Sequence, residues 1–177
     1  MKRKNSKLII LLIINIVMIV LLGLINSTLS KWGVFLYLPG VFFFFSCICL
    51  DTTRGMIACV ITGLFLDVLY NTYFGYFGFT LALFHIFGKE WLRSTINNKP
   101  WRPVLFQWGA NTILGILWYL ILLIENQRGM YWETTRFISD IVISSIIIIP
   151  ISFWVTKFNE QIMNIIFSYD LAIENDL

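Results

Sequence analysis

Apolar runs long enough to cross a lipid bilayer recur along all 177 residues, and this pattern limits what the chain can fold into more than any other feature. A helix needs about 20 mostly apolar residues to cross the hydrocarbon, where backbone N–H and C=O groups must be paired inside the protein. The sequence therefore predicts an all-α fold, a polytopic membrane bundle that forms a single domain over residues 1–177. About six transmembrane helices are expected, at residues 8–25, 32–50, 55–70, 77–92, 104–124 and 137–155.

The connection between the third and fourth predicted spans is almost as apolar as the spans themselves. It contains Tyr73, Phe74, Tyr76 and Phe77. Two full crossings are compatible with this composition, and so is a re-entrant or broken segment. The sequence leaves this choice open.

Lysine and arginine residues divide unevenly between the two sides of the predicted bundle. Basic residues are retained preferentially on the cytoplasmic side of a membrane. With the N-terminus in the cytoplasm, ten of the 13 basic residues fall on that side, and Lys31, Arg128 and Arg136 fall on the other. Both termini are therefore predicted to be cytoplasmic, and the basic loop at residues 89–102 is expected to contact anionic lipid. The net charge of +3 reflects the same bias and does not indicate nucleic-acid binding.

One acidic residue, Asp67, lies inside an apolar run and shares a helix face with small residues. A carboxylate in hydrocarbon is costly unless it faces protein or water. Gly55, Cys59 and Gly63 precede it at four-residue spacing, and small residues let transmembrane helices approach closely. The next span carries a matching stripe of residues: Gly75, Gly78, Ala82, His85 and Lys89. These two helices are predicted to pack antiparallel, with Asp67 turned toward protein.

The fifth and sixth spans also carry polar residues at helical spacing. Gln107, Asn111 and Gly115 are four residues apart, which predicts a polar seam that points into the bundle. Asp140 and Ser144 predict a shorter seam on the sixth span.

Other features concern single residues and the two ends of the chain. His85 is expected to be a neutral imidazole that donates to a backbone carbonyl or to Asn111. Pro150 is expected to kink or loosen the sixth helix. The first span is almost entirely Leu, Ile, Val and Met apart from Asn15, so it is expected to face lipid or to be held by a partner's span. The tail at residues 157–177 is predicted to form an amphipathic helix on the cytoplasmic surface, in contact with a protein or with lipid.

Asp67 and Asp140 raise the alternative of an intramembrane aspartyl peptidase, in which paired carboxylates activate water. Isolated acids inside membranes also serve packing and transport, and we favour a packing role here. Cys47, Cys49 and Cys59 lie in apolar spans without a His or carboxylate at ligand spacing. We therefore expect no catalytic, cofactor-binding or metal-binding residues.

Part of the chain resembles the rod-shape-determining protein MreD family. The matching positions are Tyr37-Leu38-Pro39, Arg54-Gly55, Gly63-Leu64 with Asp67, Gly75, and the segment 81–88 that is followed by basic Lys89 and Arg93. The resemblance covers roughly residues 37–93, and the remainder agrees only in length and hydropathy. The sequence departs from the family pattern at Gly40, because the proline of the family is typically followed by Asp.

The resemblance implies a non-enzymatic scaffold of the cell-elongation (rod shape) machinery, or elongasome, in the bacterial inner (cytoplasmic) membrane. Its implied partners are MreC, and also MreB filaments, RodA and the transpeptidase that acts with RodA in peptidoglycan synthesis. No small-molecule substrate is implied. The alternative is a substrate-capture subunit of an energy-coupling-factor vitamin transporter, because MreD-type proteins are thought to share that general fold. The first span, however, lacks the patch of small residues with which capture subunits are expected to bind the transporter core.

Eleven positions are therefore expected to serve structure or interaction: Pro39, Arg54, Gly55, Gly63, Asp67, Gly75, Gly78, His85, Gln107, Asn111 and Asp140. In this interpretation Asp67 accepts hydrogen bonds from neighbouring helices and holds one end of the bundle. Replacing it with Asn is expected to be mild, and replacing it with Leu is expected to destabilise the fold.

Overall fold

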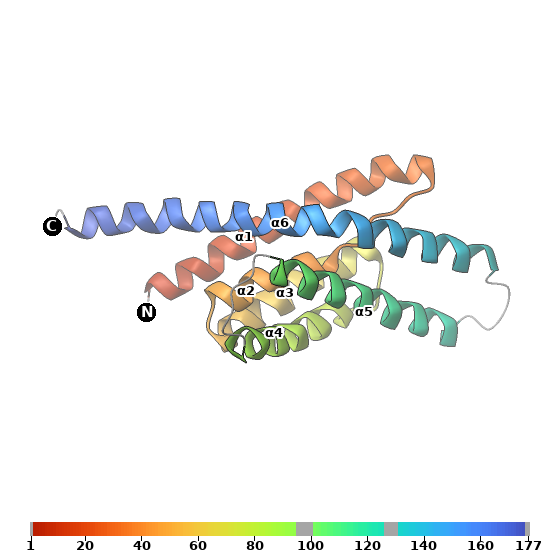
Figure 1. Cartoon of the computed structure of the whole chain (residues 1–177), viewed down its shortest axis with the longest axis horizontal. Coiled ribbons are helices and arrows are strands. Elements are labelled where there is room, and N and C mark those ends of the chain that lie inside the picture. The colour runs from red at the N-terminus through yellow and green to blue at the C-terminus, as the bar shows by residue number, and fades with distance from the viewer. Residues whose placement is uncertain (1, 95–100, 126–130, 176–177) are drawn as a thin grey trace.

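The computed structural model describes residues 2–94, 101–125 and 131–175, and every element within these ranges is helical (Figure 1). In chain order the elements are α1 (Lys2–Leu29), η1 (Ser30–Trp32), η2 (Pro39–Val41), α2 (Phe44–Cys49), α3 (Thr52–Tyr70), α4 (Tyr76–Ser94), α5 (Arg102–Glu125) and α6 (Tyr131–Asn175). Four of the described helices, α1, α3, α5 and α6, are long and apolar enough to cross a bilayer. The described part of the chain is all-α and has the long apolar helices of a membrane protein.

The second predicted span, residues 32–50, is not a continuous helix. Residues 34–38, which we call the irregular segment, belong to no regular element, and the short helices η2 and α2 follow them. Pro39 begins η2, where its missing N–H costs nothing. The expectation of one membrane-crossing helix over residues 32–50 is therefore wrong, because this stretch runs through the bundle in short pieces.

The irregular segment leads into the centre of the molecule. Residues 36–47 are buried without interruption. The rings of Phe43 and Phe44 and the side chain of Phe77 on α4 are fully buried in this core. The non-helical part of the chain is thus surrounded by the other helices.

Helices α3 and α4 form an antiparallel hairpin in which the two backbones touch. Gly63 of α3 lies against the backbone of Phe77 and Gly78, and Gly78 in turn faces the carbonyl of Val60. Further along, Gly55 lies against the ring of His85. The small-residue stripe on α3 is buried at Gly55, Cys59, Gly63 and Asp67. The two glycine contacts allow a separation that larger residues would prevent.

The remaining helices pack around this hairpin. Helices α1 and α6 cross, and α5 runs alongside α6 (Figure 1). Helix α1 begins and α6 ends at the same end of the molecule. We call this the terminal end, and it also holds Asn5, Arg54 and Lys89. The opposite end of the α3–α4 hairpin, at residues 71–75, is called the turn end.

Helix α6 has 45 residues and passes through Pro150 without interruption. The tail from residue 157 is helical but forms no separate element, because α6 continues to Asn175. Parts of two other predicted features lie outside the described residues: positions 95–100 of the basic loop and positions 126–130 of the connection between α5 and α6. Residues 176–177 of the tail lie outside them as well.

The close approach at Gly63 predicts a large effect of a single methyl group. A Cβ at this position would overlap the backbone of Phe77 and Gly78, which cannot move without separating α3 from α4. Gly63→Ala should lower the free energy of unfolding by about 1–3 kcal/mol. Denaturant titration of the protein in detergent micelles measures this. Gly109→Ala on α5 is the matched control, since a Cβ there meets no heavy atom within 4 Å. It should be neutral or should stabilise by up to about 1 kcal/mol, and equal losses for both variants would contradict the interpretation.

Candidate functional site

The irregular segment has backbone groups that belong to no helix, and residues 36–38 of it are buried. Non-helical backbone at membrane depth is tolerated only when protein or water satisfies it. Five side chains from four helices supply partners to the segment and to the start of η2. We call them the polar clamps: Asn26 of α1, Tyr70 of α3, Asn111 of α5, and Asp140 and Ser144 of α6.

Helix α6 holds one side of the irregular segment. Phe35 N donates to Asp140 Oδ1 at 3.0 Å, and Tyr37 N donates to Ser144 Oγ at 2.8 Å. Asp140 and Ser144 are one helical turn apart, so they lie on the same face of α6. Two alternate residues of the segment therefore point their N–H groups at a single helix.

Two asparagines pair the backbone in the manner of another peptide unit. Asn26 accepts from Leu36 N at 2.8 Å and donates to Leu36 O at 3.0 Å. Asn111 accepts from Gly40 N at 3.0 Å and donates to Tyr37 O at 2.9 Å. A primary amide carries both a donor and an acceptor, so each asparagine satisfies two backbone groups at once.

Tyr70, near the end of α3, completes the set. Leu38 N donates to the Tyr70 hydroxyl at 3.0 Å, and that hydroxyl donates to Leu36 O at 3.3 Å. The Tyr70 ring packs against Tyr37 and Phe77, with centroids 5.0 and 5.5 Å apart. The aromatic rings fill the space around the segment.

Gly40, the one departure from the MreD-like pattern, has a physical reason in this fold. A Cβ at Gly40 would lie 2.7 Å from Gln107 O and 2.8 Å from Asn111 Cβ. Helix α5 therefore occupies the space that an aspartate side chain would need. Asn111 provides the acceptor for the Gly40 N–H instead.

Asp67 closes the turn between α3 and α4. Its Oδ1 accepts from Thr72 Oγ1 at 2.8 Å and from Phe77 N at 2.9 Å, and its Oδ2 accepts from Gly75 N at 2.7 Å. The Asp67 carbonyl also accepts from Thr72 N at 3.0 Å. The turn places Asn71 and Gly75 at positive φ, a conformation that these two residue types adopt readily. The partners of Asp67 thus come from the turn and the start of α4 rather than from several helices.

His85 of α4 holds α2. Its Nδ1 lies 2.8 Å from Ser46 Oγ, and the Ser46 hydroxyl lies 2.5 Å from Phe43 O. A carbonyl oxygen only accepts, so Ser46 donates to Phe43 and accepts from the His85 Nδ1–H. The partner of His85 is therefore a hydroxyl and not Asn111 or a backbone carbonyl. A serine that donates elsewhere is not activated by this histidine.

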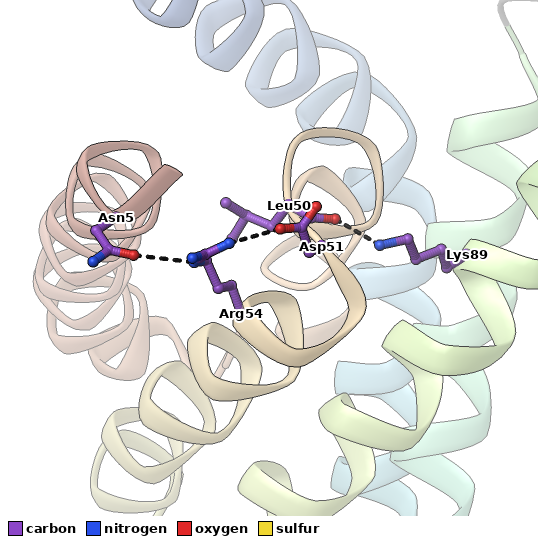
Figure 2. A network of polar contacts seen from close by, with 5 residues as sticks. All are labelled: Asn5, Leu50, Asp51, Arg54 and Lys89. Atoms are coloured by element: carbon purple, nitrogen blue, oxygen red, sulfur yellow. Dashed lines mark hydrogen bonds and ion pairs between the residues drawn. The ribbon is translucent and has the colours of Figure 1, made fainter. Parts of the chain in front are cut away.

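The terminal end carries a polar network, shown in Figure 2. Arg54 donates from Nη1 to Asp51 Oδ2 at 2.7 Å and from Nε to Asn5 Oδ1 at 3.1 Å. Lys89 Nζ donates to Leu50 O at 2.7 Å. These contacts tie the starts of α1 and α3 and the last two turns of α4 together.

Ten of the eleven sequence-predicted residues therefore divide between three places, and Gln107 lies apart from them. Pro39, Asn111 and Asp140 lie at the irregular segment. The α3–α4 interface near the turn end holds these residues: Gly63, Asp67, Gly75 and Gly78. Arg54, Gly55 and His85 lie toward the terminal end, and buried Gln107 donates to Thr156 of α6 at 3.4 Å.

The sequence does not predict the roles of two of the polar clamps, Asn26 and Tyr70. Asn26 directly follows the first predicted span and Tyr70 is the last residue of the third, so neither belongs to a polar seam within a span. Asn15 was read as a lone polar break, but it is buried and donates to Thr62 Oγ1 at 3.0 Å. The spacing of Asn15 and Asn26 is eleven residues, which is three helical turns, and this was the available signal.

The two acids that suggest a peptidase share no hydrogen-bond partner in the described part of the chain. Asp67 and Asp140 bind different backbone segments. Within the described ranges, no three His, Cys, Asp or Glu side chains are grouped so as to hold a metal ion. A groove of about 280 Å³ opens between α1, α6 and the start of the buried core, and its lining is apolar: Met18, Leu21, Leu22, Ile25, Leu38, Val41, Phe42, Ile151 and Trp154.

Comparison of the chain with models of protein families, with curated proteins and with solved structures finds no match.

The geometry around Asp67 predicts graded effects of substitution. The Asp67 carboxylate accepts from three donors, and both of its oxygens are used. In Asp67→Asn the remaining oxygen can keep the bonds to Thr72 and Phe77, but the new NH₂ group faces the Gly75 N–H, and two donors cannot pair. It should cost about 1–3 kcal/mol, more than the sequence alone indicates. Asp67→Leu leaves all three donors unpaired and should cost about 3 kcal/mol or more.

Unfolding titrations of both variants measure this difference. The neighbouring Val68→Leu serves as the control, because Val68 is 78% exposed and the change should be nearly neutral. Equal tolerance of Asn and Leu at position 67 would refute the role assigned to the carboxylate.

Proposed function

We propose that this chain is a non-enzymatic scaffold of the MreD type in the cytoplasmic membrane of a bacterium. It binds MreC and helps to couple MreB filaments to RodA and its partner transpeptidase during peptidoglycan synthesis. The observation that carries this proposal is the engagement of the MreD-like residues in contacts within the chain. Asp67 binds the α3–α4 turn, Arg54 bridges α1 and α3, and Gly63 admits the α4 backbone.

The filled interior supports a scaffold over a vitamin-capture subunit. The polar clamps, which lie around the irregular segment, are bound to its backbone by hydrogen bonds of 2.8–3.3 Å and so are occupied within the chain. The groove between α1 and α6 has only apolar side chains in its lining. A site for a small polar ligand needs a few convergent polar groups in a concave pocket.

The arrangement of acidic and hydroxyl groups supports a protein without a reaction of its own. An aspartyl peptidase needs two carboxylates that share a proton and a water molecule. Asp67 accepts from three donors in its own turn, and Asp140 accepts from the Phe35 N–H. Each acid therefore has a structural partner.

The surface offers apolar helix faces to a membrane partner. Helix α1 exposes a stripe formed by Ile13, Val17, Val20 and Leu24, each between 52 and 62% exposed. A transmembrane segment of MreC is the occupant proposed for these faces. We place the terminal end in the cytoplasm, because the basic side chains Lys7, Arg54, Lys89 and Lys157 belong to it under the positive-inside rule.

Co-purification tests this proposal. The affinity-tagged chain is expressed in a rod-shaped bacterium, extracted in mild detergent and analysed by mass spectrometry of the eluate. MreC, a bitopic coiled-coil protein, is expected as the main retained partner. An ATPase pair or a tightly bound vitamin in its place would contradict the scaffold and favour the capture subunit.

Two variants test whether retention of MreC depends on the α3–α4 turn. Val68→Leu changes an exposed side chain next to Asp67 and should retain MreC at the wild-type level. Asp67→Leu disturbs the turn and should reduce retention. Capture that is equal for both variants and for an unrelated tagged membrane protein would show that MreC binds nonspecifically.

A further inference from the structure

Three helices have apolar stretches that match the thickness of a bilayer. Basic or acidic residues flank each stretch: Lys7 and Lys31 for α1 with η1, Arg102 and Glu125 for α5, and Arg136 and Lys157 for α6, whose stretch also contains Asp140 near one end. The separations are 24, 23 and 21 residues, or about 36, 35 and 32 Å along the helix axis. A hydrocarbon layer of about 30 Å accommodates these lengths with an ordinary helix tilt.

The α3–α4 hairpin is shorter than this when it is measured from its basic residues to its turn, although the 19 residues of α3 are by themselves long enough to cross a bilayer. From Arg54 to Asn71, where α3 ends, there are 17 residues, or about 26 Å. From Lys89 back to Tyr76, where α4 begins, there are 13 residues, or about 20 Å. The turn at residues 71–75 contains no charged residue.

The shortfall lies at the turn end. The terminal ends of α1, α3 and α4 are held level by the bonds from Arg54 to Asn5 and from Lys89 to Leu50 O (Figure 2). At the other end, Tyr76 donates from its hydroxyl to Leu114 O at 2.9 Å. Helix α5 continues eleven residues beyond Leu114, or about 16 Å. Figure 1 shows the α5–α6 hairpin extending past the α3–α4 hairpin.

The chemistry of the turn fits a site without water. Asp67 pairs the N–H groups of Gly75 and Phe77 and the hydroxyl of Thr72, so these groups need no solvent. The most exposed side chains are apolar, with Phe74 85% exposed and Val68 78% exposed, while Tyr73 is 50% exposed and the polar Asn71 is exposed as well. Hydrocarbon requires the backbone groups of a turn to be paired within the protein, and Asp67 pairs those of Gly75 and Phe77.

We propose that α3 and α4 form a re-entrant hairpin whose turn ends inside the hydrocarbon of the lipid leaflet at the turn end. Lipid acyl chains cover Phe74 and Val68, while the ends of α1 and of the α5–α6 hairpin reach the leaflet surface. Asp67 makes this possible by pairing the turn in place of water. The protein therefore has a recessed apolar surface at the turn end. Acyl chains of the surrounding lipid fill this recess.

Site-directed spin labelling in liposomes measures this depth. A nitroxide is attached at Phe74→Cys in a chain whose Cys47, Cys49 and Cys59 are replaced by Ala. Collision rates are then measured with oxygen, which concentrates in hydrocarbon, and with a water-soluble nickel chelate. The label at position 74 should collide freely with oxygen and several-fold less with the chelate than a label in water does.

Two exposed positions on α1 and η1 calibrate the scale. A label at Val17→Cys lies well inside the stretch between Lys7 and Lys31 and samples the hydrocarbon. A label at Trp32→Cys replaces a side chain that is 82% exposed and adjacent to Lys31, and it samples the leaflet surface. Position 74 should resemble position 17. A match to position 32 would overturn the proposal, and shielding from both reagents would overturn it in favour of a second copy of the chain covering the turn.

A second measurement does not depend on labelling. Phe74→Asp should lower the thermal midpoint of the protein in liposomes, and Trp32→Asp should leave it unchanged. Equal midpoints for the two variants would place the turn in water.

Discussion

The structure depends on one constraint, which is that irregular backbone inside a membrane protein must find its hydrogen-bond partners within the protein. Residues 35–38 meet it mainly through the side chains of Asn26, Tyr70, Asn111, Asp140 and Ser144, and Val34 N donates to the carbonyl of Leu29. Because these side chains come from four helices, the irregular segment fixes the relative positions of α1, α3, α5 and α6. Each buried group left unpaired would cost about 1–3 kcal/mol, so the set acts as a unit and favours a single arrangement.

The α3–α4 hairpin solves the same problem by a different route. Its backbones approach at Gly63 and Gly78, and one carboxylate pairs the groups that the turn leaves open. At the opposite end His85 and Lys89 bind α2 and the carbonyl that follows it. A bundle stabilised in this way has Asp67 and the polar clamps engaged internally and leaves apolar helix faces for lipid and for partner spans. That division suits a scaffold, whose contacts with partners are made by its surface.

The sequence predicts the all-α membrane class, the pairing of α3 with α4 and the burial of Asp67, Gln107 and Asn111, because apolar length and small-residue spacing are local signals. It does not predict the break at residues 34–38. An apolar run such as Phe42 to Phe45 is compatible with a helix or with a buried irregular path, and the difference depends on partners far away in sequence. Asp140 lies 105 residues from Phe35. No local pattern connects them, and the roles of Asn26 and Tyr70 were missed for the same reason.

Amide hydrogen exchange in lipid nanodiscs tests the central claim most directly, with the N–H groups of Leu36, Tyr37 and Leu38 as the probes. If side chains pair them, these amides exchange as slowly as those in the middle of α3, and Asn26→Ala selectively accelerates exchange at Leu36. Exchange at all three amides as fast as in an unfolded peptide, or an Asn26→Ala variant with no change at Leu36, would contradict the account.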